Sequence, residues 1–248
     1  MLSPDREFNR KFDIDEETIE FKRSSIDRSK ISLANWNRYY PSWSKLHSGW
    51  YYRLAQLCDQ SGPYRQRLVI YQHECDEGDC LFDVAAIALS RYHRELHTIA
   101  LVRRLVADQI TSENFTMILE SYRLAVDHGE FEGEWDPYHV QDMDQLKRVW
   151  SVCGNTYWGD HLSLALLSEV MQMNLILLKT DSRKCLKLEQ RYQIMSTGHH
   201  LKYPMTVLIH YIDQKQFDLV GYCDDHFKIQ IVFSHDEIPR EIQLLLSK

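Results

Sequence analysis

One stretch, Glu77-Gly78-Asp79-Cys80-Leu81-Phe82, decides the fold expected of this chain, because it leads directly into an apolar run at residues 84–89. The pattern predicts a glycine-containing turn followed by a helix that begins near Cys80. At such a position, unpaired backbone N–H groups and the helix dipole favour the thiolate and can lower a cysteine pKa from ~8.5 to about 3.5–7.5. Cys80 is therefore the first candidate for a nucleophile, and we expect it to react faster than the other thiols.

Length, composition and charge narrow the classes of protein to consider. The chain has 248 residues, 44% hydrophobic and 26% charged, which is enough for one sizeable core. Its formal net charge of −7 disfavours nucleic acid as a partner, so the basic runs Arg103-Arg104 and Arg65-Gln66-Arg67 are interpreted as solvated faces. No apolar stretch approaches the ~20 residues of a membrane span, and residues 1–5 do not resemble a secretory signal. We expect an intracellular, cytoplasmic protein without a membrane partner.

The cysteines, histidines and glycines give little support for a cofactor. Six cysteines in a chain of this length fall short of a disulfide scaffold, and we expect reduced thiols. His73, Cys75 and Cys80 are closely spaced, but a single cluster without a second C-x-x-C or H-x-x-H element is weak evidence for zinc. The chain has only 9 glycines and no glycine-rich phosphate loop. The sequence therefore predicts neither a metal site nor an organic cofactor.

The beginning of the chain differs in composition from the rest. An acidic start is followed by aromatic residues concentrated between positions 36 and 52. Aromatic side chains in that number favour packing over disorder, with a partner surface as the alternative. We expect an N-terminal extension over residues 1–66, packed on a main domain over residues 67–248, with Ser61-Gly62-Pro63 near the boundary.

Hydrophobic periodicity predicts helices first and strands later. The helices expected after the Cys80 helix lie near residues 96–109, 113–128, 143–152 and 161–171. The expected strands lie at residues 67–71, 174–179, 206–212, 217–222 and 228–233, and a closing helix follows from Asp236. These elements predict an α+β (α/β) fold with a small central sheet flanked by helices.

The Cys80 stretch resembles the D-G-N-C-L-F signature of ovarian-tumour (OTU) cysteine peptidases, most of which cleave ubiquitin from proteins. Tyr157-Trp158-Gly159-Asp160 and the strand at 174–178 resemble the W-G helix and N-I strand of that family. The segment 216–220, Gln-Phe-Asp-Leu-Val, resembles its H-Y-D-x-V block. The resemblance covers residues 67–233, and the C-terminal part is most similar in style to OTU proteins of large DNA viruses.

The resemblance implies an OTU-like domain and a thiol peptidase acting on ubiquitin or a ubiquitin-like protein, in a host cell if the chain is viral. Cys80 would attack the isopeptide carbonyl, backbone N–H groups at Gly78 and Asp79 would stabilise the oxyanion, and Trp158 would bind substrate. Asp218 matches the residue that orients the catalytic histidine, so Cys80 and Asp218 should lie close together.

The departures from the family pattern concern the base and the charge near the thiol. The expected catalytic histidine is replaced by Gln216, and glutamine cannot accept and return a proton near neutral pH. Glu77 and Asp79 stand where the signature has Asp and Asn, and negative charge beside Cys80 would oppose thiolate formation. Replacing Gln216 by histidine should therefore raise cleavage of a ubiquitin substrate.

Other histidines are possible substitutes for the missing base. His210, on the strand before Gln216, is the favoured one, and His226 and His199-His200 are the alternatives. Three interpretations stay open at this stage. The chain is a peptidase with a displaced base, a catalytically impaired pseudoenzyme that binds ubiquitin, or an interaction protein in which the fold carries the aromatic N-terminal segment.

Overall fold

The computed structural model describes residues 36–58, 65–73, 78–131, 133–182, 188–196, 201–213 and 216–247. Its central element is a mixed sheet. Its strands are β1 (Trp43–Lys45), β2 (Leu68–Tyr71), β3 (Met173–Thr180), β4 (Tyr192–Ser196), β5 (Met205–Ile212), β6 (Gln216–Cys223), β7 (Ile229–Gln230) and β8 (Val232–Ser234). The main strand order is β1-β2-β6-β5-β3-β4, with β7 paired to β6 and β8 to β5. The β3–β5 pair is parallel, whereas the other pairs are antiparallel.

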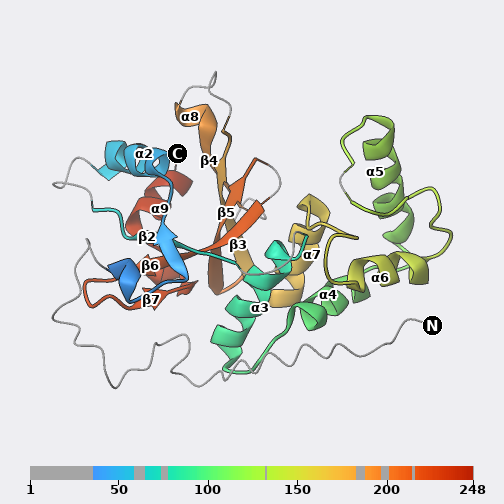
Figure 1. The fold of residues 1–248 in the computed structure, drawn as a ribbon, viewed down its shortest axis with the longest axis horizontal. Helices are drawn as coiled ribbons and strands as arrows, with labels where there is room; N and C mark the ends of the chain where they lie inside the picture. Colours follow the sequence, from blue (N-terminus) through green and yellow to red (C-terminus); the bar gives the residue numbers. More distant parts are fainter. Residues whose placement is uncertain are drawn as a thin grey trace.

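Helices cover both faces of this sheet. They are α2 (Ser48–Cys58), α3 (Cys80–His93), α4 (Ile99–Asp108), α5 (Phe115–Asp127), α6 (Met143–Ser151), α7 (His161–Met171), α8 (Leu188–Arg191) and α9 (Arg240–Leu246), with the 3-10 helices η2 (Trp36–Arg38) and η4 (His235–Glu237). Helices α3 to α7 lie to one side of the strands and α2 and α9 to the other (Figure 1). Two hydrophobic cores result, one under each layer.

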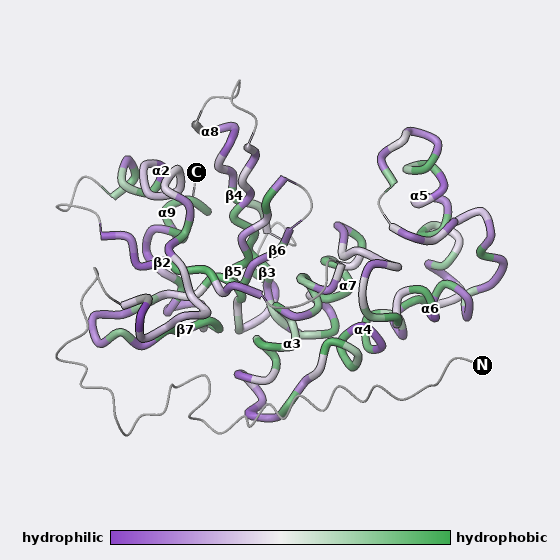
Figure 2. Tube along the Cα trace, viewed as in Figure 1, coloured by the Kyte–Doolittle hydropathy of each residue, from purple (hydrophilic) through white to green (hydrophobic). Residues whose placement is uncertain are grey.

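Side chains that alternate along the central strands contribute to both cores. On β3, Leu175 and Leu177 belong to the core under α3 to α7, whereas Ile176 and Leu178 belong to the core shared with α2 and α9. Successive residues of a strand face opposite sides, so a strand covered on both faces is apolar throughout. Hydrophobic segments accordingly concentrate in the central strands (Figure 2).

Polar caps fix where the helices around the Cys80 turn begin. The Thr98 side chain accepts from the Leu101 N–H at the start of α4. At the start of α7, Asp160 accepts from the Ser163 N–H, and the Ser163 side chain accepts in return from the Asp160 N–H. Such reciprocal capping satisfies two backbone donors and sets the direction in which the chain enters α7.

The predicted α+β class is confirmed, and the predicted strands and helices are found with two corrections. The single strand expected at 228–233 is two short strands, β7 and β8, which separate at Ile231 and pair with different neighbours. The closing helix begins at Arg240 instead of Asp236, because the position before Pro239 disfavours helical backbone.

Part of the aromatic-rich segment belongs to the sheet. Strand β1 pairs with β2. Trp50 of α2 is fully buried in the core that the sheet shares with α2 and α9. Trp36 and Tyr40 are buried in a third, smaller cluster. The boundary expected between residues 66 and 67 stays a prediction, and Ser61-Gly62-Pro63 and the acidic start lie outside the described residues.

Candidate active site

Cys80 is the first residue of α3 and is half-buried. Burial raises the pKa of its thiol, the backbone N–H groups of Phe217 and Leu81 act in the opposite direction, and the negative charge of Asp218 raises the pKa further. The thiol therefore ionises less readily than an ordinary cysteine. The expectation of a lowered pKa is wrong for this structure, because desolvation outweighs the helix start.

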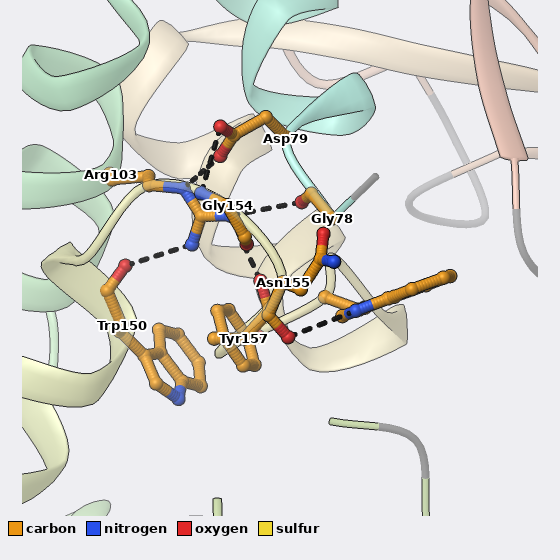
Figure 3. A network of polar contacts seen from close by, with 8 residues as sticks. Gly78, Asp79, Arg103, Trp150, Gly154, Asn155 and Tyr157 are labelled. Carbon is orange, nitrogen blue, oxygen red and sulfur yellow. Dashed lines mark hydrogen bonds and ion pairs between the residues drawn. The ribbon is translucent and has the colours of Figure 1, made fainter. Parts of the chain in front are cut away.

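The turn before Cys80 is held by a buried ion pair. The Arg103 Nε lies 2.6 Å from Asp79 Oδ1, and the second carboxylate oxygen of Asp79 accepts from the Gly154 N–H at 2.9 Å (Figure 3). Arg103 is fully buried, and its guanidinium carbon lies 4.2 Å from the centroid of the Phe82 ring. The interpretation of Arg103 as part of a solvated face is thus wrong, whereas Arg104 is exposed as expected.

The Arg103 guanidinium also donates hydrogen bonds to the backbone carbonyl groups around the turn. It donates to the backbone oxygens of Gly78 at 2.9 Å, Tyr157 at 2.9 Å, Trp150 at 3.2 Å and Gly154 at 3.3 Å. Because a trans peptide is planar, holding the Gly78 oxygen also fixes the Asp79 N–H of that peptide, on the opposite side from Arg103. A fixed N–H direction is what an oxyanion donor requires.

This network changes the role expected of the Asp79 charge. The carboxylate is buried and paired with Arg103, and it makes no side-chain cap to α3. Among the groups that shift the pKa of Cys80, the charge that raises it is that of Asp218. Asp79 therefore stabilises the turn, where the sequence suggested direct opposition to the thiolate; Glu77 lies outside the described residues.

The loop over residues 153–160 packs against the Cys80 turn. Gly78 has a φ of +91°, and a Cβ placed on it would lie 2.6 Å from the Gly154 oxygen, so both conformation and space require glycine. A Cβ on Gly159 would lie 2.6 Å from the Leu81 side chain. Trp158 lies in this loop, partly exposed, and its Nε1 donates to the Asn155 oxygen at 3.0 Å. A role for Trp158 in substrate binding stays a prediction.

The opposite wall of the site is formed by the start of β6. Gln216 is exposed, and its Nε2 donates to Asp218 Oδ1 at 2.8 Å. Asp218 is buried, and its charge acts on Cys80. The structure thus brings Cys80 and Asp218 together, as expected, and an amide occupies the position where the resemblance places an imidazole.

His210 is buried in the sheet beside Asp218. It pairs with Asp218 across β5 and β6, and its Nδ1 lies 3.5 Å from Asp218 Oδ2. Its Nε2 lies 2.8 Å from the Thr180 hydroxyl oxygen, which also accepts from the Trp50 indole. These contacts place His210 beside Asp218 on the face of the sheet toward α2, and its role as a substitute base stays a prediction.

Of the other histidines considered, His226 is exposed in the turn after β6, and His199-His200 lie outside the described residues. A pair that the sequence did not reveal lies beside the first turn of α3: His73, after β2, contacts Asp83. The signal available was the spacing of Asp83 from Cys80, three residues along a helix and therefore on one face.

The other described cysteines have thiols that ionise less readily than an ordinary cysteine. Burial raises the pKa of Cys223 to about 11, and burial also raises the pKa of Cys58 and of the exposed Cys153. Within the described residues, no group of three or more His, Cys, Asp or Glu side chains is placed to hold a metal ion, and Cys75 lies outside them. No helix in that part of the chain is both long and apolar enough to cross a membrane.

Comparisons with known proteins find OTU domains among solved structures. An OTU domain in complex with ubiquitin is 15% identical over 73% of this chain and 83% of its own, with a TM-score of 0.42. An OTU deubiquitinase from Wolbachia pipientis wMel is 16% identical over 73% and 98%, with a TM-score of 0.40, and the viral OTU domain protease from Dera Ghazi Khan virus is 11% identical over 62% and 80%, with a TM-score of 0.35. No family model and no curated protein matches the sequence. Because these TM-scores are low, the case for a function rests on the residues of the site.

Proposed function

We propose that this chain is an OTU-like thiol hydrolase that removes ubiquitin or a ubiquitin-like protein from its targets in the cytoplasm. One observation carries the proposal: Cys80 opens α3 and lies between a turn fixed by Arg103 and the β6 segment that holds Asp218. Segments far apart in sequence thereby supply a nucleophile, fixed N–H donors and a carboxylate at one place, as acyl transfer requires.

The chemistry follows from these groups. The Cys80 sulfur would attack the carbonyl carbon of the scissile amide once its proton has been taken by a base. The carbonyl oxygen would become an oxyanion near the N–H groups of the Gly78–Cys80 turn. Transfer of a proton to the leaving amine would release it and leave a thioester, which water would hydrolyse to return the thiol. Because burial raises the pKa of Cys80, the first step depends on a base.

The substrate assignment rests on the sequence resemblance and is tested directly. Cleavage of a ubiquitin C-terminal fluorogenic substrate should be detectable and should disappear in Cys80→Ala. Cys153→Ala is the matched control, because Cys153 lies beside the same turn but is not placed at a helix start. Cleavage that survives Cys80→Ala, or that depends equally on Cys153, would remove the proposed nucleophile.

A second candidate function is a ubiquitin-binding module without turnover. It is favoured by the amide of Gln216 at the position expected for the base and by the raised pKa of Cys80. If the base is missing, Gln216→His should raise cleavage by ~10²–10⁴-fold, the usual contribution of a positioned general base. A native protein that binds ubiquitin but does not cleave would establish this alternative. A native protein that cleaves and gains little from the substitution has its base elsewhere.

A further inference from the structure

His73 and Asp83 form a partly buried hydrogen-bonded pair beside the start of α3. The His73 Nδ1 lies 2.7 Å from Asp83 Oδ2, and the His73 side chain is only 7% exposed. The other ring nitrogen, Nε2, is buried and has no hydrogen-bond partner. A buried polar atom without a partner is uncommon in a native structure and calls for an explanation such as a catalytic role.

The pair determines which nitrogen of His73 carries the proton. An ionised carboxylate only accepts hydrogen bonds, so the Nδ1 facing Asp83 must be the N–H donor. In the neutral ring, Nε2 then carries the lone pair. A histidine whose Nδ1–H is held by a carboxylate and whose Nε2 is unprotonated is in the tautomer that a general base needs.

Two independent relations place this ring near the thiol. Asp83 follows Cys80 by three residues in α3, so the two side chains lie on the same face of the helix, one turn apart. The β2–β6 register pairs Ile70 with Val220, and β2 ends at Tyr71, two residues before His73, running toward the end of β6 that holds Phe217. The Phe217 N–H is one of the groups that act on the Cys80 sulfur.

We propose that His73, oriented by Asp83, is the general base for Cys80 and takes the role that Gln216 cannot fill. In this step the Sγ–H proton moves to His73 Nε2 while the sulfur bonds to the carbonyl carbon, and the same proton then goes to the leaving amine. The two atoms do not hydrogen-bond in the structure, and catalytic hydrogen bonds of unliganded enzymes commonly shorten only when substrate binds. The assignment rests on the proposed thiol hydrolase function for its substrate, but the base itself can be tested without one.

The charged and titratable groups around His73 come from three elements. Asp83 on α3 contacts the ring directly, and the ring centroid of Tyr71 on β2 lies 5.5 Å from that of His73; Cys80 lies one turn before Asp83, and Asp218 on β6 acts on that thiol. A base in this setting predicts two steps in the pH profile of Cys80 reactivity. The upper step follows the thiol, and the lower step follows its base.

The test measures alkylation of Cys80 by iodoacetamide as a function of pH, mapped by mass spectrometry, with Cys153 in the same molecule as the reference for folding. In the native protein the lower step should be present. His73→Gln should remove it and lower the Cys80 rate at neutral pH by about 10²-fold, the lower end of what a positioned base contributes. His93→Gln, at the other end of α3, is the matched control and should leave the profile unchanged.

The outcomes separate the base from the function. A native profile with a single thiol step, or a lower step that survives His73→Gln, overturns the assignment. If His73→Gln alters Cys153 as well and so disturbs the fold, Asp83→Asn decides: a weakened lower step supports the assignment, and an unchanged one overturns it. A native protein that shows the lower step but neither cleaves nor binds ubiquitin contradicts the proposed function and leaves the base assignment in place.

Discussion

The two walls of the candidate site differ in burial and in the number of hydrogen bonds that hold them. On the nucleophile wall, Gly78 and Asp79 are bonded to a fully buried Arg103 that also gathers three carbonyl groups from other segments. On the β6 wall, the position expected for the base is an exposed Gln216 whose side chain donates to Asp218.

This difference shows where the fold can tolerate change. Removing one partner of a buried ion pair leaves a buried charge without compensation. Substitutions in the nucleophile turn are therefore limited by their cost in folding stability as well as by function. An exposed residue at the end of a strand leaves nothing buried behind when it is replaced, so the base position can change at little cost to folding. A base could therefore be lost from β6, or supplied from β2, without disturbing the thiol turn.

The largest expected effect breaks the nucleophile wall. Arg103→Met should lower the free energy of unfolding by about 3–5 kcal/mol, because it leaves Asp79 buried without its partner. Chemical denaturation measures the change. Arg104→Met, the next residue on α4 and exposed, should change stability by less than about 0.5 kcal/mol. Equal effects of the two substitutions would mean that Arg103 does not hold the turn.

A smaller effect tests whether the turn and the loop over residues 153–160 are in contact. Gly78→Ala should destabilise by about 1–3 kcal/mol more than Gly154→Ala, which is the cost of forcing an atom into a packed region. The two glycines have nearly the same φ, +91° and +93°, but an added Cβ meets the Gly154 oxygen at Gly78 and open space at Gly154. Denaturation curves with the same midpoint for both variants would argue against that contact.

The smallest expected effect concerns the electrostatic influence of Asp218, on the β6 wall, on the Cys80 thiol of the nucleophile wall. Because the negative charge of Asp218 raises the pKa of Cys80, Asp218→Asn should lower that pKa and increase the thiolate fraction at neutral pH. The upper step of the Cys80 alkylation profile should move to lower pH, and alkylation at neutral pH should become faster. Asp225→Asn, which removes an exposed carboxylate beyond the end of β6, is the control. An unmoved step would place Asp218 outside the electrostatic reach of the thiol.

Local patterns in the sequence were sufficient for most helices and strands from residue 67 onward and for the position of Cys80 at a helix start. The apolar run after Cys80 and the glycine before it predicted the turn and α3, because helix starts and positive φ values depend on a few adjacent residues. The continuous apolar character of residues 174–179 predicted a buried strand for the same local reason.

What the sequence by itself determined is therefore the α+β class, the Cys80 turn and the absence of histidine at position 216. Only the tertiary structure decided which groups contact one another. Arg103 binds Asp79, His210 contacts Thr180, and His73 contacts Asp83. The physical reason is that a helix or strand fixes the spacing of its own side chains, whereas contacts between elements depend on packing and register, which no single segment encodes.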